Sequence, residues 1–556
     1  MTAHRTASTP ERRLSALDAS YLYNESPDNP LHIGGALIFE GHIPFDAIVR
    51  SVEQRLHLLP YYRRRLVEAP FNLARPTLED DPEFRLENHL KRFRLPPGID
   101  ERQATRQVMR DYRPMLDRSR PLWELLSFEG WPGGNTLVVS KTHHALADGV
   151  ASINLTKRLF DFRPDAPPPG APAGHRSLTP VPSPAQRFFD ATREVMVSQV
   201  DALTDVMIQA LRDPGELARR NRQLLEALGK IGGPPGRQIV ATPWNAGPKS
   251  DAHDLVWLRT SVSDYRIIRD SFGGTTNDVV LTLLTEAAGR YLREHGFSTS
   301  GWLRIACPVS VRRPEEQTDV GNRVSMMFPT IPAAPMDPVE RLKLVRVETG
   351  RVTPDEMQNL DWLGLRWTGS FQVDAYTGFP NGVFTTSLLE QLAPPNLAAL
   401  RSRTERLGMD ASTKLQRMID WRPRLGNRLT LPPELSFVVT CVPSVQAPVY
   451  LCGHRCLQQL GILPVGWNLG YGVTILSYNH DRYIAMSAQQ SLMPDLDRMR
   501  EHVQAVFEEL KVAAIKRRSS EAPGRRTATQ RTPAVVPQNT WGATFSGLDL
   551  RLALLK

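Results

Sequence analysis

A proline-rich stretch in the first third of the chain limits what the chain can fold into. Eight prolines lie between Pro164 and Pro184, mixed with glycine and alanine. Such a stretch can neither form the interior of a sheet nor continue a helix, which indicates a linker. Because 556 residues also exceed what one hydrophobic core usually holds, we expect globular parts on both sides of it.

Strand and helix patterns occur on both sides of this linker. Apolar alternation predicts strands, and i, i+3, i+4 spacing predicts helices. The expected strands are 33–39, 122–128, 136–142, 302–311 and 473–478. The expected helices are 45–59, 101–116, 150–160, 186–230 and 278–292. The chain therefore belongs to the α/β class, with mixed sheets flanked by helices.

These patterns divide the chain into four parts. We expect an N-terminal lobe over 1–162 and a proline-rich linker with a helical crossover over 163–249. A C-terminal lobe follows over 250–515, with a largely helical insertion near 341–430. The basic tail 516–556 is rich in polar residues and proline and is expected to be disordered.

The composition limits the classes of binding partner but does not identify a single class. Apolar residues make up 41% and charged residues 23%, a balance typical of globular proteins, and the formal net charge is +9. Basic clusters such as 63–65 and 516–518 suit nucleic acid, anionic lipid or phosphate-bearing ligands, and most such clusters are simply solvated. No basic–aromatic motif is interleaved with them, so we expect no nucleic-acid partner.

The cysteines and the N-terminus indicate a cytoplasmic protein. Four cysteines in so long a chain favour a reducing compartment, and none of them forms a CxxC pair. Cys452 and Cys456 have no second ligand pair nearby, so we expect no metal site. The first residues lack an apolar signal core, and no run approaches the roughly eighteen apolar residues of a membrane span. Any membrane contact is expected to be peripheral.

The segment His143-His144-Ala-Leu-Ala-Asp148-Gly149 carries the chemistry that the sequence suggests. Alternation along the strand that begins at Asn135 sends the two histidines to opposite faces, so they are not expected to share a metal. An imidazole titrates near about 6.5, which suits a general base at neutral pH. There is no GxSxG motif and no cysteine near the histidines, so a covalent acyl-enzyme is not expected.

Several other residues can be explained either by a structural role or by a functional one. Asp148 lies four residues after His144 and could orient it if a helix has begun there, while Gly149 permits a tight turn. Asn277 and Asp278 are good helix N-caps, which alone would explain them. Pro121-Leu122-Trp123 fits core residues that open a strand better than it fits a substrate contact.

This HHxxxDG segment, in its setting, resembles that of the wax ester synthase/diacylglycerol acyltransferase family. Pro121-Leu122-Trp123 matches the family's Pro-Leu-Trp motif, about twenty residues before the histidines, and Asn277-Asp278 matches its Asn-Asp motif. Further counterparts, in the family's order, are Leu14–Asp18, Asn29–Gly35, Cys307–Arg312 and Gly321–Asn322. The resemblance covers roughly residues 12–510, with gaps.

The resemblance implies two lobes like those of chloramphenicol acetyltransferase, with a tunnel between them. It implies transfer of a long-chain acyl group from acyl-CoA to diacylglycerol or a long-chain alcohol, without a cofactor. His144 would be the general base, and Asp148 would pair with an arginine, for which Arg312 is the best candidate. Because the acceptor is a lipid alcohol, we expect the protein to localise to the inner membrane face or to the surface of lipid droplets.

The chain departs from the family pattern at Thr440–Val445, where the family's usual Thr-Asn-Val-Pro-Gly-Pro run has lost its asparagine and glycine. With the 341–430 insertion, this departure bears on the acceptor and on the activity level. Two alternatives stay open. One is a condensation-type acyltransferase with another acceptor, although no carrier-domain signature flanks the chain. The other is a catalytically weak, lipid-binding paralogue.

Overall fold

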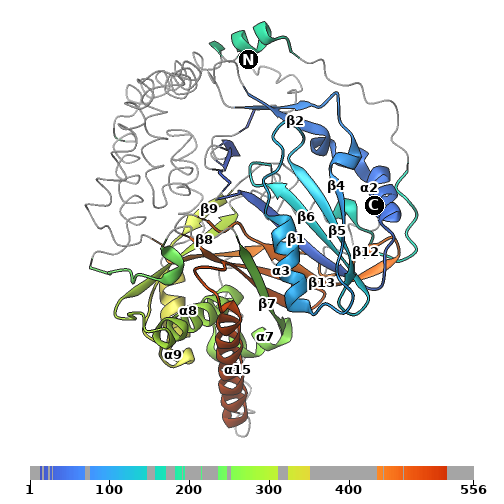
Figure 1. Cartoon of the computed structure of the whole chain (residues 1–556). Helices are drawn as coiled ribbons and strands as arrows, with labels where there is room; N and C mark the ends of the chain where they lie inside the picture. The colour runs from blue at the N-terminus through green and yellow to red at the C-terminus, as the bar shows by residue number, and fades with distance from the viewer. Residues whose placement is uncertain are drawn as a thin grey trace.

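The structure is a computed structural model that describes most of both lobes. The described residues are 13–14, 18–19, 21–22, 25–27, 29–68, 76–146, 157–170, 182–190, 192–193, 215, 236–246, 252–310, 324–350, 435–442, 444–466 and 469–521. Two main sheets form within them, one built mostly from the first part of the chain and one from the last (Figure 1). The expected pair of mixed α/β lobes is therefore confirmed, with separate sheets rather than one continuous sheet.

The first sheet has six strands in the order β12-β13-β1-β6-β5-β4. These strands are β1 (His32–Phe39), β4 (Leu90–Arg94), β5 (Trp123–Trp131), β6 (Asn135–His143), β12 (Tyr450–Leu451) and β13 (His454–Ile462). Strand β13 comes from the far end of the chain and pairs antiparallel with β1, Gly34 lying opposite Ile462. The sequence placed all of 250–515 in the C-terminal lobe and did not anticipate that this strand would complete the N-terminal sheet.

Helices α2 (Phe45–Arg55) and α3 (Glu101–Tyr112) belong to the first lobe and are shorter than expected. Helix α2 gives way to a 3-10 turn at Leu56–Leu58. Helix α3 is capped by Asp100, whose carboxylate accepts the Gln103 amide at 2.7 Å, and it ends before Pro114 because the residue preceding a proline disfavours helix.

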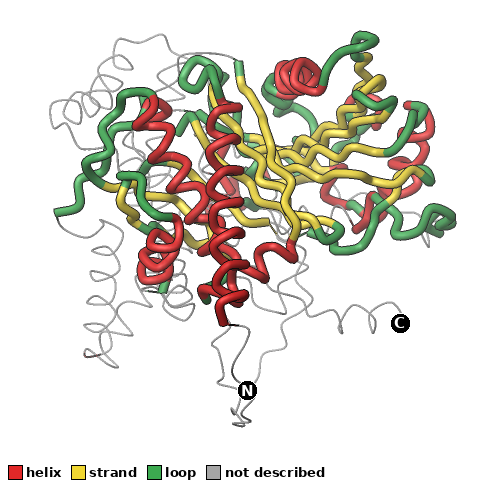
Figure 2. Tube along the Cα trace, turned by 90° about the horizontal axis from the view of Figure 1, so that it is seen from below, coloured by secondary structure: helices red, strands yellow, loops and turns green. Residues whose placement is uncertain are grey.

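The second sheet runs β10-β8-β11-β14-β15-β7, and β9 pairs with β8. Its strands are β7 (His253–Ser261), β8 (Trp302–Ser310), β9 (Val324–Met327), β10 (Thr330–Pro332), β11 (Phe437–Val442), β14 (Tyr471–Tyr478) and β15 (Asp481–Gln489). Four helices pack on it through one large apolar core: α7 (Val262–Phe272), α8 (Thr276–Glu294), α9 (Pro338–Thr349) and α15 (Leu496–Glu521) (Figure 2). Helix α15 runs to Glu521, so the first residues of the tail are helical, contrary to the expected disorder from 516.

Helix α3 also holds the two lobes together. The Arg102 guanidinium forms a bidentate ion pair with Asp254 at the start of β7, and its Nε lies 2.7 Å from Asp497 of α15. The Asp254 side chain is almost completely buried, so this pair is shielded from salt. One arginine of the first lobe thereby reaches a strand and a helix of the second.

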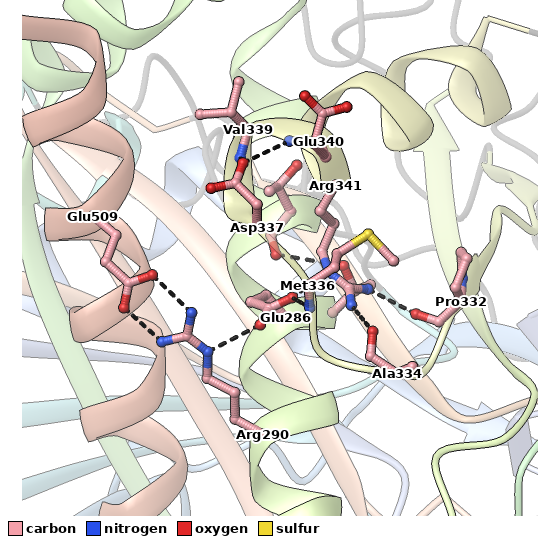
Figure 3. Close-up of polar contacts among 12 residues, drawn as sticks. Glu286, Arg290, Pro332, Ala334, Met336, Asp337, Val339, Glu340, Arg341 and Glu509 are labelled. Carbon is pink, nitrogen blue, oxygen red and sulfur yellow. Dashed lines mark hydrogen bonds and ion pairs between the residues drawn. The ribbon is translucent and has the colours of Figure 1, made fainter. Parts of the chain in front are cut away.

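A buried ion pair organises the helical layer of the second lobe (Figure 3). Arg341 of α9 and Glu286 of α8 are both buried, and Nε lies 2.6 Å from Oε2. The other guanidinium nitrogens donate to the carbonyls of Pro332 and Ala334, at 2.7 and 2.6 Å. Through these bonds to two loop carbonyls, Arg341 fixes the path from β10 into α9.

We expect Arg341→Met to lower the free energy of unfolding by up to about 3–5 kcal/mol, because it removes one of the two arginines that pair with the buried Glu286 carboxylate and leaves the carbonyls of Pro332 and Ala334 without their donor. Urea denaturation followed by circular dichroism measures this. Lys343→Met on the same helix is the matched control, since Lys343 is 61% exposed, and its effect should stay within about 0.5 kcal/mol. Equal stability of the two variants would contradict the assignment.

Candidate active site

The two histidines lie at the end of β6: His143 is its last residue, and His144 follows directly. The backbone N–H of His143 donates to the Leu122 carbonyl at 3.0 Å, and that of His144 donates to the Leu31 carbonyl at 2.9 Å. The chain then turns, with the Leu146 amide donating to the His143 carbonyl. Backbone bonds from both neighbouring segments therefore hold the two positions, before any side chain contributes.

The imidazole of His143 is fully buried and its hydrogen-bonding direction is defined. Its Nδ1 accepts the backbone N–H of Ala145 at 3.1 Å, so Nδ1 carries no proton. The proton of the neutral ring is then on Nε2, which lies 3.3 Å from Oε2 of Glu25. A carboxylate in that position selects this tautomer and holds the ring.

Glu25 is the buried acid of the site. Its Oε1 accepts the Leu31 amide at 3.1 Å, and its Oε2 accepts from the Arg118 guanidinium at 3.0 Å. Burial by itself would raise the pKa of this carboxyl, but hydrogen bonds from His143, Arg118 and the Leu31 amide lower the pKa below its ordinary value of 4.5. Glu25 is therefore ionised at neutral pH.

His144 has different surroundings from its neighbour. It is half-buried, and its ring stacks on the ring of Tyr21 with centroids 4.0 Å apart and planes 6° apart. Glu25 contacts His143, whereas Tyr21 contacts His144. Of the two imidazoles, only His144 keeps exposed surface, as a base that meets a substrate hydroxyl requires.

More buried polar groups lie on the side of β6 that carries His143. His32 of β1 is directly opposite His143 in the sheet. Burial lowers the pKa of His32 well below its usual range, and the charge of Lys141 adds to the effect. Lys141 is itself buried, with Nζ bonded to the Pro114 carbonyl and 3.3 Å from Glu124. His32 is therefore neutral at physiological pH.

The Pro-Leu-Trp segment lies in the interior of the first lobe. Pro121, Leu122 and Trp123 are all buried. The Trp123 indole N–H donates to the Tyr62 carbonyl at 2.8 Å, and its ring lies between those of Tyr62 and His89. The Leu122 carbonyl accepts the amide of His143, so this segment also sets the position of the histidine.

The Asn-Asp pair begins α8, but neither residue is its N-cap. Thr275 is the N-cap: its hydroxyl accepts the Asp278 amide at 3.1 Å, while the Asp278 carboxylate accepts the Thr275 amide at 2.7 Å. This is a capping box, in which Asp278 acts from the third helical position. Asp278 also accepts the Thr349 hydroxyl and so links α8 to α9, while Asn277 lies within the first turn.

Three expected site residues, Asp148, Gly149 and Arg312, lie outside the described residues. The departure at Thr440–Val445 is described apart from residue 443. Thr440 lies in β11, opposite Thr474 of the parallel strand β14, so a regular strand persists there without the family's asparagine.

Glu25 and Tyr21 were not among the residues expected at the site. Both precede the first strand, more than a hundred positions before the histidines, and no local spacing connects them. Glu25 and Arg118 are 93 positions apart. A lone acid and a lone aromatic residue carry no pattern of their own, so only the fold reveals their contacts.

The two-lobed fold has counterparts among solved structures. The structure is similar to a wax ester synthase/diacylglycerol acyltransferase from Marinobacter aquaeolei VT8, with a TM-score of 0.56, 19% identity and coverage of 90% of this chain and 99% of that one. It is also similar to the first condensation domain of the calcium-dependent antibiotic synthetase, with a TM-score of 0.52, 14% identity and coverage of 91% and 98%. At these identities the likeness concerns the fold alone.

Sequence comparison is more specific. The wax ester synthase/diacylglycerol acyltransferase catalytic domain matches residues 14–280, and the family's C-terminal domain matches residues 393–511. A putative diacylglycerol O-acyltransferase of Mycobacterium tuberculosis is 27% identical over 500 residues, 87% of each chain. The probable diacylglycerol O-acyltransferase tgs1 of the same species is 26% identical over 515 residues, 91% of this chain and 96% of the relative. The chain belongs to the wax ester synthase/diacylglycerol acyltransferase family.

We expect Glu25→Gln to lower stability at neutral pH by roughly 1.5–3 kcal/mol, because it removes the charge from buried hydrogen bonds to Arg118 and His143. The folded pKa of Glu25 is depressed, so this contribution is fully present above about 4.5 and is lost as pH falls through the folded value. The stability gap between the wild type and the variant should therefore narrow below pH 4.5. Thermal melts from pH 7 to 3 measure it.

Glu53→Gln is the control for that series, since Glu53 is an exposed residue of α2. The difference in stability between Glu53→Gln and the wild type should stay near zero at every pH. A Glu25→Gln gap that persists unchanged at low pH would show that the charge of Glu25 does not stabilise the site.

Proposed function

We propose that the protein transfers a long-chain acyl group from acyl-CoA to the hydroxyl of diacylglycerol, with His144 as the general base. The observation that carries this is the half-buried imidazole of His144 beside a neighbour locked by Glu25. Family membership and mycobacterial relatives named as diacylglycerol O-acyltransferases support the substrate class.

The reaction needs one proton carrier. A ring nitrogen of His144 takes the proton of the acceptor hydroxyl as the oxygen attacks the thioester carbonyl carbon. The C–S bond then breaks, and the departing CoA thiolate takes the proton from the imidazolium, which regenerates the base. Because the thioester is already activated, the proposal includes neither a covalent acyl-enzyme nor a cofactor beyond the acyl-CoA substrate.

A long-chain alcohol is the second candidate acceptor, which would make the product a wax ester. The structural neighbour from Marinobacter aquaeolei, named for both activities, favours including it. The condensation-type alternative has support only from fold similarity. The weak-paralogue alternative has less support, because the histidine pair is intact and its neighbour Glu25 is ionised.

The roles of three residues expected at the site, a tunnel between the lobes and the lobe boundaries are further parts of the proposal. From the family resemblance, we propose that Asp148 pairs with Arg312 and that Gly149 permits a tight turn after His144. A tunnel between the lobes brings both substrates to His144. The boundaries near 162 and 250 separate the lobes, apart from β12 and β13, which cross to the first sheet.

We expect His144→Ala to reduce ester formation by roughly 10²–10⁴-fold, because a positioned base is lost, while the circular-dichroism spectrum and acyl-CoA binding persist. The assay uses purified protein and palmitoyl-CoA, with diacylglycerol, monoacylglycerol and hexadecanol as separate acceptors. His143→Ala should lower the melting temperature together with activity, since its ring is buried against Glu25. Wild-type turnover in His144→Ala with any acceptor that the native protein uses would refute the mechanism.

We propose further that the protein works at an anionic lipid surface on the cytoplasmic side, where a lipid acceptor partitions. None of the described helices combines the length and apolar character that a membrane crossing needs. The last turns of α15 support peripheral attachment: every residue from Ile515 to Ser520 is exposed, and Lys516 and Arg518 lie there. Val512 and Ile515 are 47% and 46% exposed beside them. Exposed apolar and basic side chains together suit a headgroup layer.

Lys516→Glu with Arg518→Glu should therefore weaken binding to vesicles that contain phosphatidylserine, because each basic residue near such a surface contributes about 1 kcal/mol. Vesicle co-sedimentation at two salt concentrations measures this. The matched control is Lys343→Glu, a charge reversal at another exposed lysine. Equal sedimentation of the two variants would contradict the assignment to α15.

A further inference from the structure

The ring of Tyr21 covers one face of the proposed base. The two ring centroids are 4.0 Å apart and the planes differ by 6°, so the contact is face to face. Tyr21 is only 3% exposed, whereas His144 is half-buried. The stack is therefore shielded from water on the side of the tyrosine, and substrate can approach the imidazole only from its other sides.

Tyr21 belongs to a segment that is anchored to the same polar cluster as His143. The carbonyl of Leu22, the next residue, accepts from the Arg118 guanidinium at 2.6 Å. Arg118 also binds Glu25, which lies 3.3 Å from Nε2 of His143. One short stretch before the first strand thus reaches both histidines, through a carboxylate for one and an aromatic face for the other.

We propose that Tyr21 is a positioning residue for His144. The phenol ring of Tyr21 fixes the plane of the imidazole and stabilises the imidazolium that forms during acyl transfer. The face of an aromatic ring carries negative charge density and attracts a cation held over it. When His144 takes the hydroxyl proton, a neutral stacked ring becomes a cation over that face. The inference rests on the proposed role of His144 as base.

Two charged groups of this polar cluster, Glu25 and Arg118, have defined partners. Glu25 pairs with Arg118 and lies against His143. Asp18, buried three positions before Tyr21, belongs to the same segment. The pKa of Glu25 is lowered by its partners, so Glu25 stays ionised throughout a neutral pH profile and contributes no titration there.

The test is the pH dependence of kcat/KM for palmitoyl-CoA and diacylglycerol in the wild type, Tyr21→Phe and Tyr21→Leu. Tyr21→Phe keeps the ring and should keep both the rate, within about 3-fold, and the acidic limb. Tyr21→Leu should lower kcat by roughly 3- to 30-fold and move the acidic limb to lower pH by about 0.5–1.5, because the imidazolium loses its stabilising face. Tyr21→Met replaces Tyr21→Leu if the leucine variant does not fold.

Three results would overturn the inference. One is a Tyr21→Leu or Tyr21→Met enzyme that turns over like the wild type. Another is a slower enzyme whose acidic limb has not moved, since a merely structural role lowers the rate without changing the pKa of the base. A Tyr21→Phe enzyme as impaired as the leucine variant would assign the effect to the hydroxyl and also contradict it. Full activity in His144→Ala would instead refute the proposed function itself.

Discussion

The antiparallel pairing of β13 with β1 is the constraint on which the rest of the structure depends. Strand β1 has β6 on its other side, and that register places His32 opposite His143. The sheet that carries the histidines is therefore completed by a strand from the end of the chain. Without β13, the side of β1 that faces away from β6 would be an unpaired strand edge. Arg102 adds an ion pair between the lobes at the same interface.

Around the histidines, burial separates two chemical roles. His143 accepts from Ala145 and faces an ionised carboxylate, which holds its ring in one tautomer. His144 has a stacked aromatic ring on one face and keeps exposed surface elsewhere. A rigid neighbour next to an accessible imidazole is the arrangement that the proposed proton transfer requires. The rigidity comes from the fold, because Glu25 and Arg118 reach the site from different segments.

Strands and helices were predictable where local pattern and burial agree. The strand 302–311 and the helix 278–292 were found almost as expected, as β8 and α8. Ends were less predictable. Helix α3 stops before Pro114, and the cap of α8 is Thr275 rather than Asn277, because capping geometry depends on single hydrogen bonds that periodicity does not contain. The start of the tail is helical because α15 packs on the second lobe as far as Ala514.

The sequence by itself determined the α/β class and the histidine pair at a strand end. Each of these follows from residues close together in the sequence: apolar residues that repeat every 2 or every 3.6 positions, or a short motif. Only the tertiary structure decided which side chains meet those histidines. Glu25 and Tyr21 contact them across more than a hundred positions, and β13 joins a sheet whose other main strands lie over three hundred positions earlier. Contacts of that range depend on how whole sheets pack, which no local pattern encodes.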